Sequence, residues 1–330
     1  MKVGFTKLLL LLATTMLSLF CLSLILPSSF AEPFLLLELL SKDSDIARTI
    51  FLELRIPRTS LALIVGASLG LAGAAMQGLL RNPLAEPGVV GVSGSAALGA
   101  TLAFYSGLAS IMPLALPLGG IAGALFAVIL LFTIAGKRAG IATLLLAGIA
   151  INAIAGALTA LVLNLSPNPF AAMEIIFWQM GSLADRSLLH LQLAGPLMLI
   201  GWALILLAAP ATRALSLGEA TAVSLGINIR NTQVKIIGGT ALCVGAGVAV
   251  TGVIGFVGLV VPHLLRKLCN NDPAQLLLAS AAGGASLLLA ADIAVRCIPA
   301  SAELKLGVIT ALLGAPFFLY LIFQLRKLEQ

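Results

Sequence analysis

Apolar runs of membrane-spanning length recur along almost the whole chain, and they restrict its fold more than any other feature. A helix needs about twenty mostly apolar residues to cross the hydrocarbon core of a bilayer. We expect ten such spans, separated by short polar or charged segments. They are Leu8–Leu26, Ser60–Leu80, Val89–Leu108, Pro113–Ala135, Ile141–Leu163, Leu191–Pro210, Val234–Gly252, Gly258–Leu268, Leu276–Val295 and Leu306–Leu325.

The composition excludes a soluble globular protein. Hydrophobic residues make up 60% of the chain and charged residues only 10%, whereas a soluble domain typically carries about 25% charged residues. A globular protein of this size cannot bury that much apolar surface. The 33 glycines fit close helix packing in lipid, which relies on small residues. We therefore predict an all-α polytopic membrane protein in which residues 1–330 form a single transmembrane domain.

The charged residues between the runs predict the orientation in the membrane. Lys and Arg are enriched in cytoplasmic segments close to helix ends. With the amino terminus inside, the cytoplasmic segments hold 12 of the 19 basic residues but only 4 of the 13 acidic residues. An even number of crossings then places both termini in the cytoplasm. Because the basic residues are spread among the loops, the net charge of +6 reflects membrane topology rather than nucleic-acid binding.

The first run, Leu8–Leu26, is compatible with a cleaved signal peptide as well as with a retained helix. Lys2 and Lys7 give it a basic start, and Ser29-Phe-Ala31 resembles a cleavage site. However, the apolar core of a signal peptide usually has roughly 7–15 residues, and this run is longer. We expect the helix to be retained.

The short eighth run follows a stretch in which glycines interrupt the apolar pattern, Gly252–Gly258. Irregular backbone at membrane depth is stable only where protein or a water-filled cavity covers it. Such interruptions often lie near transport pathways, but the same stretch is also compatible with a simple kink. The sequence leaves both interpretations open.

Three segments between the runs are long or polar enough to fold outside the membrane. Residues 27–58 and 164–190 fall on the periplasmic side, and residues 211–232 fall on the cytoplasmic side. Within the last of these, Ala214–Ile227 has helical character. A short surface helix at this position suits docking of a soluble partner.

Few side chains within the runs carry a charge or could support catalysis. Asp292 is the acidic residue well inside a run, and we expect it to form an i,i+4 ion pair with Arg296. An ion-coupled secondary transporter would need carboxylates or histidines deep in several spans. An intramembrane enzyme would need a nucleophile–base pair or a metal triad, for which His190 and His263 are too isolated. We predict no catalytic site, no metal site and no bound cofactor.

Five sequence blocks occur together, in order, along essentially the whole chain. They are Leu54-Arg-Ile-Pro-Arg58, Arg81-Asn-Pro-Leu-Ala-Glu-Pro-Gly88 with Gly91-Val-Ser93, Leu217-Gly-Glu-Ala-Thr221 with Leu225-Gly226, Gly255-Phe-Val-Gly-Leu-Val-Val-Pro-His263, and Ala302-Glu303 with Gly314-Ala-Pro316. The set resembles the FecCD-type permeases of ATP-binding-cassette (ABC) importers. The resemblance implies the type II ABC importer permease fold. Since the chain has no GxxxxGK[ST] motif for phosphate binding, ATP would be used by a partner subunit.

The resemblance also implies where partners bind. Acidic groups of a periplasmic substrate-binding protein would meet Arg55, Arg58 and Arg296 at an outer rim; the alternative is that these arginines anchor helix ends among lipid headgroups. ATPase coupling would involve the cytoplasmic segment, for which an ordinary interfacial helix is the alternative. The coupling residues are Leu217, Gly218, Glu219, Ala220, Thr221, Leu225 and Gly226.

Gates and pathway residues follow from the same resemblance. The cytoplasmic gates would be formed by Asn82, Leu84, Gly140, Ile141 and Ala142. The second gate lacks the small hydroxyl residues expected of cobalamin permeases, which weakens cobalamin as the cargo. The pathway would be lined by Asn152, Thr159, Thr310 and Gly314, although a buried polar side chain more commonly bridges two helices.

These expectations combine into one hypothesis. The chain would be a permease of the bacterial inner membrane, paired with a second copy of itself or with a paralogous permease. A cytoplasmic ABC ATPase dimer and a periplasmic substrate-binding protein would be its partners. Iron(III)-siderophore complexes are the expected cargo because they are the commonest cargo of the resembled family, followed by haem and then cobalamin.

Overall fold

The computed structural model describes residues 4–26, 48–112, 114–136, 140–166, 168–298 and 304–328, without the side chains of residues 110, 322 and 324–328. All regular secondary structure in these residues is helical. Several features used above lie outside the described residues, namely Lys2, Pro113, Ala302, Glu303 and residues 27–47 of the predicted first periplasmic segment, which include Ser29–Ala31.

The predicted order of ten apolar segments is confirmed. Among the described helices, seven are long and apolar enough to span a membrane: α1 (Phe5–Ile25), η1 with α4 (Ile50–Arg55 and Ile56–Leu80), α7 (Ala115–Ala135), α8 (Ile141–Asn164), α10 (Leu188–Leu207), α13 (Ile229–Thr251) and α15 (Pro273–Cys297). Three shorter apolar stretches complete the set: α5 (Val92–Tyr105), α14 (Val257–Arg266) and Leu306–Leu321 of α16 (Leu306–Leu328).

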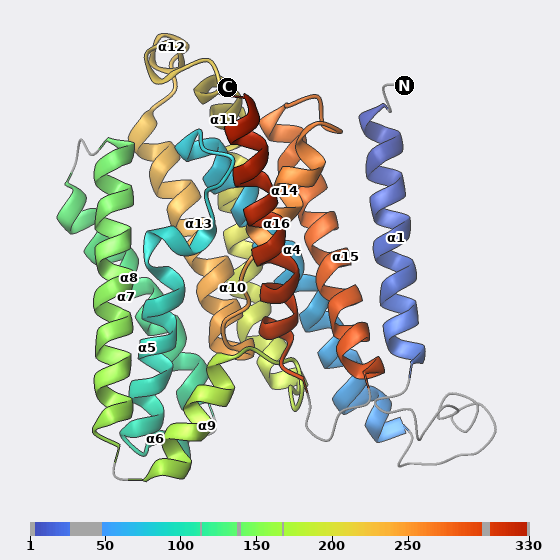
Figure 1. Cartoon of the computed structure of the whole chain (residues 1–330), viewed down its shortest axis with the longest axis vertical. Helices are drawn as coiled ribbons and strands as arrows, with labels where there is room; N and C mark the ends of the chain where they lie inside the picture. The colour runs from blue at the N-terminus through green and yellow to red at the C-terminus, as the bar shows by residue number, and fades with distance from the viewer. Residues whose placement is uncertain are drawn as a thin grey trace.

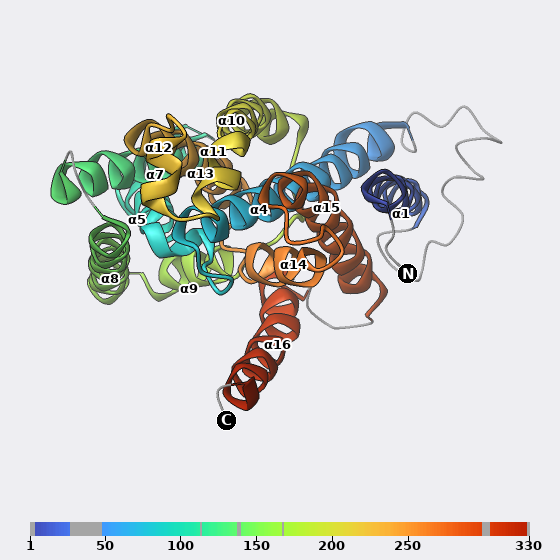
Figure 2. The same cartoon turned by 90° about the horizontal axis from the view of Figure 1, so that it is seen from above.

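The helices form one bundle around α4 and α13, whose apolar residues are mostly buried by their neighbours. Figure 2 shows α1 beside α15 on one flank, α8 on the opposite flank, and α16 projecting away from the rest. Large apolar side chains on α8 and α16 are exposed, as expected for surfaces that face lipid or another protein; Leu146, Leu312 and Leu319 are examples.

The two ends of the bundle carry different short helices. The start of α1 and the end of α16 lie at the same end as α11 (Ala209–Leu215) and α12 (Glu219–Ser224), in agreement with an even number of crossings (Figure 1). The opposite end carries α6 (Leu108–Ile111) and α9 (Pro169–Gln179). We refer to these as the α12 end and the α9 end.

Glycines allow α4 and α15 to approach each other with their backbones in contact. A Cβ atom at Gly70 would lie 2.0 Å from the carbonyl oxygen of Ser280, and one at Gly66 would lie 2.4 Å from that of Gly284. The absence of side chains is therefore what sets the separation of these helices, as is typical of small-residue packing in membranes.

The expected boundary of the second span is wrong. Residues 50–58 are expected in the periplasmic segment that precedes the span, but the π-helical turn η1 (Ile50–Arg55) runs directly into α4. The wider turn precedes Pro57, which has no N–H to donate to the carbonyl of Glu53 in an α-helical pattern. Because the helix begins earlier, Arg55 and Arg58 lie within it.

The expected single helix over Ala214–Ile227 is divided into α11 and α12. The chain turns at Gly218, where φ is +107°, a value that L side chains rarely adopt. Two short helices joined by this turn therefore form the tip of the α12 end (Figure 1).

Candidate functional site

A cavity of about 830 Å³ lies beside α8, and we call it the pathway cavity. Its walls come from α5, α8, the segment before α5 and the break between α13 and α14; the lining includes Glu86, Ser93, Asn152, Thr159, Gln179, Val253, Gly255 and Phe256. Two predicted pathway residues, Asn152 and Thr159, are thus in its wall, although the Thr159 hydroxyl donates to the carbonyl of Ala155 in its own helix. Glu86 is the charged residue among the lining side chains.

The glycine-rich break is a true interruption and not a kink within one helix. Between Thr251 and Val257 the described backbone is not helical. Val253 N–H donates to the carbonyl of Gln179 at 3.3 Å, and Ser182 N–H donates to that of Thr251 at 2.7 Å. The irregular backbone is therefore paired in part with the end of α9 and the residues that follow it. It also lies against a cavity, the setting in which non-helical structure is found at membrane depth.

A second hollow of about 670 Å³ lies on the other side of the break, against α16, and we call it the α16 groove. It is lined by Gln179, Met180, Val253, Gly255, Phe256, Gly307, Val308, Ala311, Leu312, Ala315, Pro316 and Leu319. The predicted pathway residues of α16 do not line it. Thr310 is buried and donates to the carbonyl of Gly307, and Gly314 packs against Phe256.

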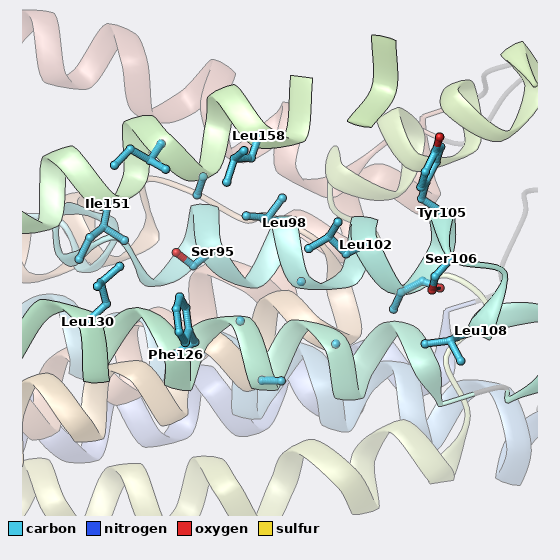
Figure 3. Close-up of a pocket in the computed structure, with 17 residues that line it drawn as sticks. Ser95, Leu98, Leu102, Tyr105, Ser106, Leu108, Phe126, Leu130, Ile151 and Leu158 are labelled. Atoms are coloured by element: carbon cyan, nitrogen blue, oxygen red, sulfur yellow. Dashed lines mark hydrogen bonds between the residues drawn. The ribbon is translucent and has the colours of Figure 1, made fainter. Parts of the chain in front are cut away.

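A third cavity, of about 690 Å³, lies between α5, α7 and α8 and was not expected from the sequence. Figure 3 shows Leu98, Phe126 and Leu158 along it, with the hydroxyl of Tyr105 at one end. Its lining is almost entirely apolar. The sequence gives no signal for it because the lining residues are indistinguishable from others in the same helices.

The predicted gate residues lie at the α12 end. Arg81 ends α4 with φ of +49°, and Leu84 N–H donates to Oδ1 of Asn82 at 2.9 Å, which closes a tight turn. Gly140 begins α8, so Ile141 and Ala142 form its first turn. Among the described residues no hydrogen bond joins these two loops. Their gating role stays a prediction.

The predicted coupling segment presents exposed apolar side chains at the α12 end. Leu217, Val223 and Leu225 are 66%, 56% and 61% exposed. Glu219 is exposed at the start of α12, while Ala222 is fully buried and holds the helix to the bundle. Such apolar side chains on a polar loop are typical of a protein-binding surface.

An ion pair that the sequence did not predict connects this segment to α15. The Arg213 guanidinium donates to both carboxylate oxygens of Asp272, at 2.9 and 2.7 Å. Asp272 also caps α15, because its Oδ1 accepts from Ala274 N–H at 2.9 Å. These contacts hold the pKa of the Asp272 carboxyl below its ordinary value. Their contribution to stability is present at neutral pH and is lost as the pH falls through the lowered pKa.

We expect D272A to lower thermal stability more than D272N. Alanine loses the cap, worth about 1 kcal/mol, and the exposed ion pair, worth roughly 0.2–1 kcal/mol, whereas asparagine keeps a capping oxygen. R213A breaks the pair alone and should match D272N in a melting curve of the purified protein. If R213A lowered the melting temperature as much as D272A, the result would contradict a contribution from the cap.

The predicted i,i+4 ion pair of Asp292 and Arg296 is confirmed, and it has a third member. Arg296 Nε lies 3.2 Å from Oδ2 of Asp292. Arg58 of α4 donates from Nε to Oδ1 at 3.0 Å, and its NH2 lies 3.0 Å from the same oxygen. Asp292 is 1% exposed. One buried carboxylate is therefore shared by two guanidinium groups.

The same cluster connects α1 to the bundle. Arg296 donates to the carbonyl and the hydroxyl of Ser23, at 3.0 and 2.6 Å. The Ser23 hydroxyl also lies 2.9 Å from that of Thr59, and Arg55 donates to the carbonyl of Leu24 at 3.1 Å. These contacts give this end of α1 a defined place against α4 and α15, while retention of the first helix stays a prediction.

The expectation that three arginines line an exposed rim is wrong for two of them. Arg55 is 3% exposed, and the Arg296 side chain is 5% exposed, compared with 16% for Arg58. Arg55 and Arg296 point between helices because their hydrogen-bond acceptors, Asp292, Ser23 and the end of α1, lie there. Their role in docking stays a prediction.

Comparison with protein families and known proteins agrees with this arrangement. The model of the FecCD transport family matches residues 11–324. The chain is 42% identical to the hemin transport system permease protein HmuU of Yersinia pestis, over 85% of this chain and 84% of that protein. It is 40% identical to the vitamin B12 import system permease protein BtuC of Vibrio cholerae, over 84% of both chains.

A solved structure has the same fold. It is described as an inward-facing conformation of an ABC transporter of the metal-chelate type. The two structures superpose with a TM-score of 0.86 and 30% sequence identity, over 97% of this chain and 99% of the other.

Proposed function

The chain belongs to the FecCD transport family and is a permease subunit of an ABC importer, and from this premise we propose that it conducts a large metal macrocycle across the bacterial inner membrane. ATP is hydrolysed by a separate partner subunit in such importers. The proposal concerns the cargo, the orientation and the surfaces that partners use.

The pathway cavity is the observation that carries the proposal. It lies where the backbone is interrupted, and most of its wall is apolar, with a few polar groups from α5, α8 and the end of α9. A carrier that must release its cargo needs weak binding. A mostly apolar wall with one carboxylate suits a cargo whose metal is already chelated.

Hemin is the first candidate cargo. The relative named for hemin transport is 42% identical and that named for vitamin B12 import is 40% identical, which favours a macrocyclic chelate over the siderophore complex expected from family frequency. Cobalamin is a weaker candidate, because the predicted gate Gly140-Ile-Ala142 lacks the small hydroxyl residues expected of cobalamin permeases. Iron(III)-siderophore complexes are the second candidate.

We propose that the α12 end faces the cytoplasm and binds the ATPase through Leu217, Glu219 and Leu225. The excess of basic residues on that side supports this orientation. The substrate-binding protein would dock at the α9 end, near Arg55, Arg58 and Arg296, on a homodimer of the chain. The exposed apolar faces of α8 and α16 support pairing with a second copy.

The direct test is uptake into proteoliposomes that contain the chain with its ATPase and its binding protein. Equal concentrations of hemin, a ferric hydroxamate siderophore and cyanocobalamin would be compared, with and without ATP. ATP-dependent uptake of hemin alone supports the proposal. Selective uptake of either other cargo would reject hemin, and no ATP-dependent uptake of any would reject the macrocycle and siderophore assignments together.

We expect E219A to separate ATP hydrolysis from transport. Glu219 is exposed at the first turn of α12, so its loss should weaken the contact with the ATPase without unfolding the permease. Uptake should fall several-fold, while basal ATP hydrolysis by the complex persists. Ser224 lies on the same short helix and is also exposed, so S224A is the matched control. Full uptake with E219A would remove Glu219 from the coupling surface.

A further inference from the structure

The break between α13 and α14 is the wall between the pathway cavity and the α16 groove. Gln179, Val253, Gly255 and Phe256 line both hollows. Any movement of this short segment changes the width of both. What holds Phe256 in position therefore matters for the pathway.

The backbone of Phe256 is held from the side of the pathway cavity. Its N–H donates to Oε1 of Glu86 at 2.9 Å, and Phe256 is the residue that precedes α14. Its φ is +66°, which is unusual for a bulky residue and needs support from the surroundings. Glu86 provides that support from a loop 170 residues away in sequence.

The side chain of Phe256 is held from the opposite side by α16. A Cβ atom built on Gly314 would lie 2.3 Å from both Cβ and Cγ of Phe256. The aromatic side chain thus occupies the space that any residue larger than glycine would need at this position of α16. A close contact of this kind fixes the side chain between the two elements.

The first turn of α14, which follows Phe256, is packed tightly against α4. A Cβ atom at Gly73 would lie 1.9 Å from the carbonyl oxygen of Gly258, so the two backbones touch. Gln77, which is buried, donates from Nε2 to the carbonyls of Gly258 and Leu259 at 3.4 Å. A movement of the wall would therefore be confined to the residues before α14.

We infer that Phe256 is a positioning residue that holds the wall in place and so keeps the pathway cavity separate from the α16 groove. Glu86 and Gly314 hold Phe256 from opposite sides, and we call this arrangement the clamp. The inference rests on the proposed function, since it assumes that the pathway cavity is part of the route. Glu86 acts through its hydrogen bond to Phe256 and not as a ligand of the cargo. Loss of either side of the clamp should let the wall move.

The experiment uses the complete importer in proteoliposomes loaded with carboxyfluorescein, without nucleotide. E86A removes the acceptor and G314A displaces the aromatic side chain, so both should raise dye release several-fold over wild type. E86Q keeps an oxygen acceptor and should remain near wild type. G238A is the matched glycine control, because a Cβ at Gly238 meets nothing within 4 Å.

A second readout measures the clamp without any transport. G314A should lower the melting temperature of the wild-type chain but lower it far less in an F256G background, because glycine removes the atoms that clash and also accepts a positive φ. Equal losses in the two backgrounds would overturn the contact of Gly314 with Phe256.

The outcomes separate this inference from the proposed function. Dye release that stays at the wild-type level in folded E86A and G314A overturns the clamp, whatever the cargo proves to be. E86Q as leaky as E86A overturns the role given to the hydrogen bond. Failure of ATP-dependent uptake in the wild-type importer rejects the proposed cargo instead, and leaves the dye and melting measurements as independent tests of the wall.

Discussion

D292N is expected to destabilise the protein by about 3–5 kcal/mol, the range found when one partner of a buried ion pair is removed. Asp292 is 1% exposed and lies within 3.2 Å of both Arg58 and Arg296. Asparagine can still accept a hydrogen bond but removes the negative charge that the largely buried guanidinium groups of Arg58 and Arg296 share. The measurement is the thermal unfolding of the purified protein in detergent.

Removing one arginine should cost less than removing the shared carboxylate. In R58M the apolar side chain fills similar space, and Asp292 keeps its pair with Arg296. E53Q is the matched control, because Glu53 is an exposed carboxylate in the turn that leads into α4. A melting temperature for R58M equal to or below that of D292N would show that the carboxylate is not the centre of the cluster.

The features that could be predicted from the sequence are those that local composition determines. The ten apolar segments follow from the length of each run, because a helix in lipid must satisfy its backbone internally. The glycines of Gly252–Gly258 mark the place of an irregularity, although they do not distinguish a kink from the interruption that the structure has. The pair of Asp292 and Arg296 follows from helical spacing alone. None of these requires knowledge of what lies across the bundle.

The features that could not be predicted depend on partners far away in sequence. Arg58 meets Asp292 across 234 residues, and Phe256 meets Glu86 across 170. Two arginines near a predicted helix start look the same whether they face water or a buried carboxylate. The direction in which such arginines point is thus decided by packing, which is why the expected exposed rim is wrong for Arg55 and Arg296.

G70A is expected to be among the most damaging single-methyl changes in the chain. A Cβ at Gly70 would lie 2.0 Å from the carbonyl oxygen of Ser280 and 3.2 Å from Cα of Gly284. All these atoms belong to the backbone of α15, so no side chain can rotate away and α4 must separate from α15. Overpacking of this kind typically costs about 1–3 kcal/mol, and sometimes more. The melting temperature should fall accordingly.

The control for G70A is the same substitution at Gly238, which should raise stability instead of lowering it. G238A adds its methyl group to open space, and alanine in a helix is more stable than glycine by roughly 0.5–1 kcal/mol. A partner change also tests the mechanism. S280G should not restore the stability lost in G70A, because the atom in contact is the backbone oxygen of Ser280. F256G should restore the stability lost in G314A, because the atoms in contact there belong to the side chain of Phe256. Rescue by S280G would show that the α4–α15 separation is not fixed by backbone contact.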